Sequence, residues 1–293
     1  MKKLSVIYVL IAGIMWGLIG LFVRGLDNYS FGSMEIVFFR ALSGTFLMGM
    51  FLLFYNRNLF KIKIKDIWCF VGTGIISLTF FNICYFKTIS MTSLAVAAIL
   101  LYTAPSIVMI LSLYIFKERM TVRKIISVIM AFVGCVFVTG VLSSDSVINP
   151  AGILLGLGSG FGYALYSIFA RFALNKGYHS FTVTFYTLLM SGIGTVAFFE
   201  PGHMVNITKS NPSFILVLLL FGLVSTVLPY IFYTLGLSGM EAGKASIIAS
   251  IEPVTATLLG ITVFGESMSF MSLCGALIVL ASIVIVNINA PQR

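Results

Sequence analysis

Residues 93–118 read SLAVAAILLYTAPSIVMILSLYIFKE, and residues 241–266 read EAGKASIIASIEPVTATLLGITVFGE. The two stretches align without a gap at a spacing of 148 residues, which places Pro105 opposite Pro253. Self-similarity at a fixed period identifies a repeat architecture, so the chain is expected to contain two copies of one unit. The other matched pairs are Tyr85 and Tyr233, Phe116 and Phe264, Glu118 and Glu266, and, at a spacing of 147, Trp16 and Tyr163, Phe22 and Phe169, Arg24 and Arg171.

The composition is that of a membrane protein. Hydrophobic residues make up 59% of the chain and charged residues 9%, whereas soluble domains have about 45–50% and about 25%. The apolar residues form long runs, and a helix of about 20 apolar residues spans the hydrocarbon core of a bilayer. We expect an all-α polytopic membrane protein with ten transmembrane helices, at 4–23, 33–54, 68–87, 93–115, 122–141, 151–172, 180–199, 214–236, 243–264 and 269–287.

The ten expected helices divide into two repeats of five, at residues 1–142 and 150–289. Because five is an odd number, the second repeat must insert upside down relative to the first. Inverted repeats of this kind are common in secondary transporters, where two near-equivalent halves rock around a site at the midplane of the membrane.

The orientation follows from the distribution of Lys and Arg, which favour cytoplasmic loops. With both termini in the cytoplasm, the outer loops carry only Arg24, Lys87 and Lys209. This bias predicts a multi-pass protein of the cytoplasmic membrane with both termini inside, and it accounts for the net charge of +9 without a nucleic-acid partner. The cations placed inside are Lys2, Lys3, Arg57, Lys61, Lys63, Lys65, Lys117, Arg119, Arg123, Lys124, Arg171, Lys176, Lys244 and Arg293.

The fourth span of each half carries a proline near its centre, Pro105 and Pro253. Proline removes one helix hydrogen bond and clashes with the carbonyl four residues earlier, so both positions are expected to break the helix. A freed carbonyl at this depth needs a partner or must line a wet cavity. A packing kink and a group of carbonyls beside a substrate site are both compatible with this pattern.

Short motifs recur in both halves. The first half contains SLAVAA at 93–98, TAP at 103–105 and FKE at 116–118, and the second contains AGKAS at 242–246, IEPV at 251–254 and FGE at 264–266. Together with Trp16-Gly17, these motifs resemble the EamA-type transporters of the drug/metabolite transporter superfamily, over nearly the entire chain. The resemblance implies ten spans with inverted halves and secondary transport of small metabolites, often export, without ATP.

Ionisable side chains within the expected spans are candidate functional groups, because they are rare and costly in the bilayer. Arg40 lies in the second span and Glu252 lies at the middle of the ninth, whereas Glu35 is near the outer end and could reach the headgroups. Arg40 is expected to bind an anion, gate the pathway or act as a structural strut. Its partner must come from another helix, with Glu252, a tyrosine hydroxyl or a broken-helix carbonyl as options. A buried Glu252 would suit a proton carrier, but the first half has Ala104 at the matching position.

Aromatic residues share helix faces with polar neighbours and are expected to form an apolar cavity with a few hydrogen-bonding groups, as in many small-molecule sites. Each pair at a spacing of three lies on one face. An interfacial aromatic belt would explain the residues nearer the ends of the spans equally well. The expected substrate-binding residues are Trp16, Arg40, Asn82, Tyr85, Tyr102, Tyr163, Tyr166, Tyr230, Tyr233 and Glu252.

The remaining patterns have structural interpretations. The glycines at 156, 158, 160 and 162, like Gly13 and Gly17, are expected to allow close helix packing. Glu118 and Glu266 are each expected to cap the helix that follows. The four cysteines occur singly, so we expect packing roles and neither a disulfide nor a metal site.

These observations lead to one functional prediction with two alternatives. We expect a secondary transporter that exports an amino acid or related metabolite, whose two charges could bind Arg40 and Glu252. The alternatives are an organic cation or drug transporter, through cation–π contact, and a lipid-carrier translocase. We expect no enzyme activity, no cofactor and no catalytic residue. The expected partners are a small-molecule substrate, the lipid bilayer and a coupling proton.

Overall fold

The computed structural model describes residues 2–26, 31–139, 149–200, 202, 209, 214–265 and 269–288. Within these residues the chain is helical and contains no strand. The helices are α1 (Lys2–Gly17), α2 (Ile19–Leu26), α3 (Ser33–Tyr55), α4 (Ile67–Val71), α5 (Phe80–Met91), α6 (Leu94–Leu101), α7 (Ala104–Phe116), α8 (Val122–Val138), α9 (Pro150–Asn175), α10 (Ser180–Thr195), α12 (Phe214–Gly222), α13 (Leu228–Ser238), α14 (Ala242–Ala249), α15 (Ile251–Phe264) and α16 (Phe270–Asn287). Between α4 and α5 lies the π-helical segment Gly72–Thr79, and between α12 and α13 lies the π-helical segment Leu223–Val227.

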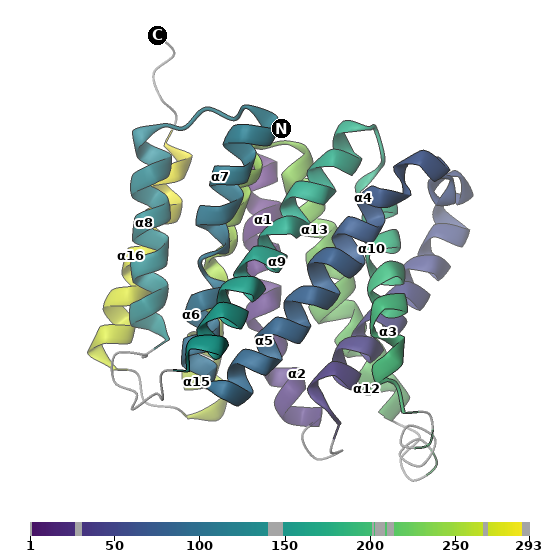
Figure 1. Ribbon diagram of the computed structural model, residues 1–293, viewed down its shortest axis with the longest axis horizontal. Coiled ribbons are helices and arrows are strands. Elements are labelled where there is room, and N and C mark those ends of the chain that lie inside the picture. The colour runs from purple at the N-terminus through teal and green to yellow at the C-terminus, as the bar shows by residue number, and fades with distance from the viewer. Residues whose placement is uncertain are drawn as a thin grey trace.

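The helices confirm the expected membrane architecture. Nine stretches of the described chain are long and apolar enough to cross a membrane: Lys3–Val23, Ser33–Tyr55, Ile64–Met91, Leu94–Phe116, Pro150–Asn175, Ser180–Phe198, Phe214–Ser238, Ala242–Phe264 and Phe270–Asn287. The remaining expected span, 122–141, corresponds to α8, which is 17 residues long and packs along α16. The protein is an all-α polytopic membrane protein. In Figure 1, α1 begins and α16 ends at the same end of the bundle.

Equivalent helices of the two halves make equivalent contacts. Helix α1 lies against α13, and its repeat counterpart α9 lies against α5. In the same way α1 contacts α14 and α15, whereas α9 contacts α6 and α7. The pairs α3–α10 and α8–α16 are each their own counterpart, and they lie on opposite sides of the bundle in Figure 1. This reciprocity is what two inverted repeats around a twofold axis produce.

Individual glycines reproduce the symmetry at atomic scale and confirm that these residues serve close helix packing. A Cβ on Gly13 would lie 2.5 Å from Ile251 Cγ2 and 3.0 Å from the Ala249 carbonyl oxygen. A Cβ on Gly160 would lie 2.5 Å from Thr103 Oγ1 and 3.3 Å from the carbonyl oxygen of Leu101, the counterpart of Ala249. Only a residue without a side chain lets α1 approach the break between α14 and α15 so closely, and the same holds for α9 at the break between α6 and α7.

The fourth and ninth spans are both broken, at equivalent positions. Helix α6 ends at Leu101 before α7 begins at Ala104, and α14 ends at Ala249 before α15 begins at Ile251. Pro105 and Pro253 lie in the first turn of the second segment, where proline's missing N–H leaves no helix bond unmade. The carbonyls four residues before them belong to Leu101 and Ala249, and both face the glycines described above. This contact favours the packing interpretation of the break.

The symmetry fails in one place. Seven of the eight residues of α14 are buried, whereas only Ala97 and Leu101 are buried in the eight residues of its counterpart α6. The side chain of Leu94, the first residue of α6, is 63% exposed. Helix α14 packs against α7 and α8 of the first half, and α6 does not pack to the same extent against α15 and α16. The two ends of the bundle are therefore closed to different degrees.

Candidate substrate-binding site

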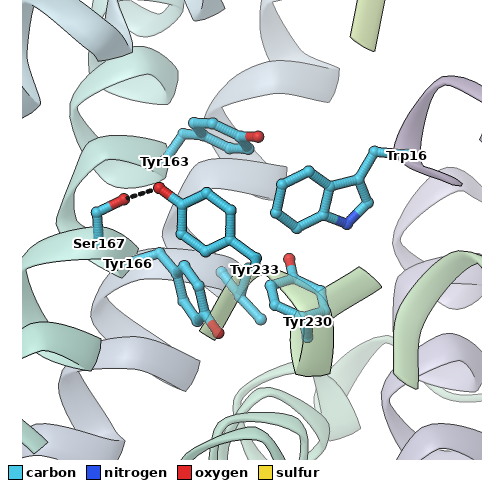
Figure 2. A pocket seen from close by; sticks show the side chains of 7 residues that line it. Trp16, Tyr163, Tyr166, Ser167, Tyr230 and Tyr233 are labelled. Carbon is cyan, nitrogen blue, oxygen red and sulfur yellow. Dashed lines mark hydrogen bonds between the residues drawn. The ribbon is translucent and has the colours of Figure 1, made fainter. Parts of the chain in front are cut away.

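A cavity lies where helices from both halves meet (Figure 2). The space inside it that no atom fills is about 240 Å³, a figure that includes space open to solvent. Helix α1 contributes one residue to the wall, α9 three, α13 two and the first π-helical segment one. The lining residues are Trp16, Leu78, Tyr163, Tyr166, Ser167, Tyr230 and Tyr233.

Aromatic rings form most of the wall. The Trp16 ring lies 5.3 Å from the centres of both Tyr230 and Tyr233 and 6.2 Å from that of Tyr163. Tyr166 completes the cluster, with its ring centre 5.0 Å from that of Tyr230. Most of these pairs meet edge to face, the geometry that aromatic quadrupoles favour. Five of the expected site residues are thus brought together at one place.

Two tyrosine hydroxyls in the wall are held by partners on neighbouring helices. The Tyr233 hydroxyl and Ser167 Oγ are 2.7 Å apart, as the dashed line in Figure 2 shows. The Tyr166 hydroxyl lies 3.0 Å from Thr234 Oγ1, which in turn donates to the Tyr230 carbonyl at 2.5 Å. Because α9 and α13 are joined by these bonds, the rings are fixed in position. The sequence did not single out Ser167 or Thr234, although each lies four residues after a candidate tyrosine and so shares its face.

Glu252 stands beside this cavity at the break between α14 and α15. It lies in the first turn of α15, where the positive end of the helix dipole stabilises a carboxylate. The Tyr163 hydroxyl donates to Glu252 Oε2 over 3.4 Å, a long hydrogen bond. The carboxylate is also close enough to Tyr85 and Tyr102 for electrostatic interaction. The acid that is hydrogen-bonded to the aromatic wall is therefore on the second half.

Arg40 reaches across from α3 to the π-helical segment of the other half. Its Nε donates to Thr226 Oγ1 at 3.1 Å, and its Nη2 donates to the Ser225 carbonyl at 3.2 Å. The guanidinium also lies 5.3 Å from the centre of the Phe221 ring. No ion pair joins it to Glu252, whose charge acts on it from a greater distance, as does Tyr230. The π-helical segment thus supplies the carbonyl that accepts from Arg40, and no pattern in the sequence predicted this segment.

Besides Arg40 and Glu252, three further expected site residues do not line the cavity. Asn82 is buried and donates through Nδ2 to the Leu78 carbonyl at 2.7 Å, within its own helix. The Tyr85 ring packs on Phe81, with centroids 5.8 Å apart. Tyr102 is at the break between α6 and α7, half-buried against the core. Glu35, which could have reached the headgroups, is instead buried, with 6% of its surface exposed.

Glu118 was expected to cap the helix that follows it, α8, and this prediction is wrong. Helix α8 is capped by Thr121, whose side chain accepts from the Lys124 N–H at 3.3 Å. Glu118 instead accepts from the N–H of Ala242 at 2.7 Å and of Gly243 at 3.3 Å, at the start of α14 in the other half. Local spacing favoured the helix next in sequence, but the inverted packing brings a distant one closer. Glu266 lies outside the described residues.

A metal centre has no support in the part of the chain that the structure describes, where no three His, Cys, Asp or Glu side chains come together. The arrangement is an apolar cavity with a few hydroxyls, one carboxylate beside it and one guanidinium farther away. It is suited to hold a small solute.

The EamA-like transporter family matches residues 3–140 and again residues 150–288. The chain belongs to the EamA-like transporter family. This EamA-like transporter is 30% identical over 202 residues to an uncharacterized transporter of Archaeoglobus fulgidus, covering 69% of this chain and 70% of the relative. It is 26% identical to the uncharacterized transporter YwfM of Bacillus subtilis, covering 98% of this chain and 94% of the relative.

A solved crystal structure has the same fold as this EamA-like transporter. The two superpose with a TM-score of 0.82 at 15% sequence identity, covering 98% of this chain and 97% of the other. The family match and the relatives named as transporters establish a multi-pass membrane transporter.

Proposed function

We propose that this protein is a secondary transporter that exports an amino acid or a closely related zwitterion across the cytoplasmic membrane. The observation that carries the proposal is the aromatic cavity with Glu252 at its edge, hydrogen-bonded to Tyr163. A protonated amine would be attracted both by the carboxylate and by the faces of Trp16 and the tyrosines, through cation–π contact. The substrate carboxylate would bind Arg40.

An organic cation without a carboxylate is the second candidate, and the environment of Arg40 favours it. Two hydrogen bonds and the ring of Phe221 already engage the guanidinium. If Arg40 is only a strut, the site has aromatic walls and one acid, which suits an amine or quaternary ammonium. A lipid-carrier translocase remains the third candidate.

Alternating access is supported by the unequal closure of the two ends. In a pair of inverted repeats, the two access states are related by exchanging the conformations of the halves. Helices α6 and α14 are counterparts, yet only α14 is largely buried. The same sequence unit thus adopts two degrees of closure within one molecule, as a rocking mechanism requires. A proton is the proposed coupling ion, because Glu252 could bind either the substrate amine or a proton.

Ligand-induced thermal stabilisation of the detergent-purified protein tests the proposal, because a ligand that binds the folded state raises its apparent stability. The probes are amino acids and quaternary amines, each measured on wild type, Glu252→Gln and Arg40→Gln. The matched controls are Glu200→Gln and Arg57→Gln, two exposed positions. We expect stabilisation by an amino acid that both site variants abolish and both controls retain.

The other outcomes each have a meaning. Stabilisation by quaternary amines alone, lost only in Glu252→Gln, would contradict the zwitterion and establish the cation. Stabilisation that survives in Glu252→Gln would remove the carboxylate from the site altogether.

A further inference from the structure

The N-terminus of α14 is capped by the opposite half of the molecule. Its own N-cap residue, Glu241, makes no capping hydrogen bond through its side chain. The two carboxylate oxygens of Glu118 accept instead from the N–H groups of Ala242 and Gly243. The counterpart helix α6 needs no such help, because Ser93 Oγ accepts from the Val96 N–H at 3.2 Å. One helix is self-capped and its equivalent is not.

A lysine holds this contact from both sides. Lys124 Nζ lies 2.6 Å from Glu241 Oε2 and 4.0 Å from Glu118 Oε2, and it donates to the Arg119 carbonyl at 2.8 Å. The side chains of Lys124 and Glu118 are 9% and 8% exposed. Because Lys124 and Glu118 are both mostly buried, water screens their attraction little, whereas the closer partner Glu241 is 44% exposed. Glu118, Lys124 and the start of α14 therefore form a charged junction between the halves.

The junction closes one end of the bundle tightly. A Cβ on Gly243 would lie 3.4 Å from Met109 Cα and 3.6 Å from Glu118 Oε2, so α7 and α14 are in contact at this point. The junction lies at the end of the bundle where α1 begins and α16 ends (Figure 1), the proposed cytoplasmic end. If α14 moved away from α7, the N–H groups of Ala242 and Gly243 would lose the Glu118 carboxylate, and the N-cap residue Glu241 makes no capping hydrogen bond in its place.

We propose that Glu118 and Lys124 form a latch that holds the cytoplasmic end closed through α14. The proposal rests on the alternating-access function above. Opening this end requires the Glu118 carboxylate to leave the helix N-terminus, so the bond is made in one access state only. The self-capped α6 can separate from its neighbours without such a loss. The latch thus biases the resting protein towards the state closed on the inside.

Hydrogen–deuterium exchange of the purified protein without substrate tests the latch. In wild type, the amides of α14 are expected to exchange more slowly than those of α6. In Glu118→Ala, α14 should exchange about tenfold faster or more, since a hydrogen bond to a charged group contributes about 1.5–3 kcal/mol, whereas α6 should not change. The matched control is Asp66→Asn. Asp66 is also a buried carboxylate that bridges the halves, to Lys176 and Tyr178, but it lies away from α14.

Two results would overturn the latch: unchanged exchange in α14, or an equal increase in both helices or in the control. If Glu118→Ala does not fold, Glu241→Gln tests the lysine arm on a side chain that is 44% exposed. The Glu241→Gln variant should show a smaller increase in exchange rate that is confined to α14. If the exchange of α14 does not increase in this variant, the proposal is also contradicted. Because the measurement needs no solute, the latch can fail while the substrate proposal stands, and the reverse.

Discussion

Tyr163 is the residue that couples the aromatic cavity to the acid beside it. Its ring packs on Trp16 and Phe81, and its hydroxyl donates to Glu252. The sequence predicted Tyr163 as a site residue from the helix face that it shares with Tyr166, and it predicted Glu252 from the rarity of acids within a span. It could not predict that the two meet, because their bond depends on how α9 packs against the other helices of its own half.

Replacing Tyr163 by Phe removes the donor and keeps the ring. We expect the affinity for the amine-bearing substrate to fall about fivefold, since the lost bond is long and worth about 1 kcal/mol. Ligand-dependent thermal shifts measure the change. Tyr114→Phe is the matched control, because that side chain is 77% exposed, and it should bind as wild type does. Equal affinity in Tyr163→Phe would show that the hydroxyl does not contribute to binding.

Lys176 is expected to make a pH-dependent contribution to the stability of the folded protein. The carboxylate of Asp66, 2.7 Å away, raises the pKa of Lys176 above its ordinary value of 10.5. A raised pKa means that the ammonium form stabilises the folded state at every pH below about 10.5, and that this contribution is lost as the pH rises through the folded-state pKa. The melting temperature of Lys176→Gln should therefore lie below that of wild type at pH 8, and the two should converge above pH 10.5. A difference that does not change with pH would contradict this.

At the scale of helices, the glycines determine how closely the elements approach. Gly13 and Gly160 occupy equivalent positions and face backbone carbonyls across the helix crossing. A methyl group there requires the helices to move apart, and overpacking of this kind costs about 1–3 kcal/mol. Gly20, in α2, has no atom within 4 Å of the place where a Cβ would lie, so it serves as the control.

Gly13→Ala and Gly160→Ala should each lower the melting temperature by several degrees, whereas Gly20→Ala should leave it unchanged or raise it slightly, because Ala favours helix. Differential scanning fluorimetry in detergent measures all three. If Gly13→Ala and Gly20→Ala behaved alike, the α1–α14 crossing would not be as close as the structure has it.

The elements also show the limits of sequence patterns. Long apolar runs predicted nine spans that the described residues contain, and the tenth corresponds to the shorter helix α8, because hydrophobic length is a direct consequence of bilayer thickness. The prolines predicted both helix breaks, which fall two or three residues earlier. The π-helical segments 72–79 and 223–227 had no such signal. They arise from packing between the halves, and one of them supplies the carbonyl that binds Arg40.

At the scale of the whole molecule, the repeat predicted the inverted architecture, since an odd number of spans leaves no other arrangement. It could not predict the asymmetry, because the burial of α14 and the exposure of its counterpart α6 depend on how the two halves pack. Which end of the bundle is closed is decided only when the two halves pack together. For the same reason the target of Glu118 could not be read from its local sequence.

Reporter fusions test the orientation of the whole molecule. With both termini in the cytoplasm, a fluorescent protein fused after Arg293 should fluoresce, and alkaline phosphatase fused there should be inactive, because it needs an oxidising compartment to form its disulfides. Phosphatase fused after Glu200, in an expected outer loop, should be active. The reverse pattern would place both termini outside, so the proposed transport would be import and the Glu118–Lys124 junction would lie at the outer end.

Gly13 and Gly160 make the same contact with opposite halves, so a single half contains what it needs to bind an inverted copy of itself. A shorter ancestral gene, encoding five helices that insert in both orientations, could thus have formed this interface as an antiparallel homodimer. In such a dimer every substitution appears twice. Fusion of two copies into one chain removes that constraint, and it permits Glu252 on one side with Ala104 on the other. An acid at position 252 with alanine at the matching position 104 is a difference that only two fused copies can carry.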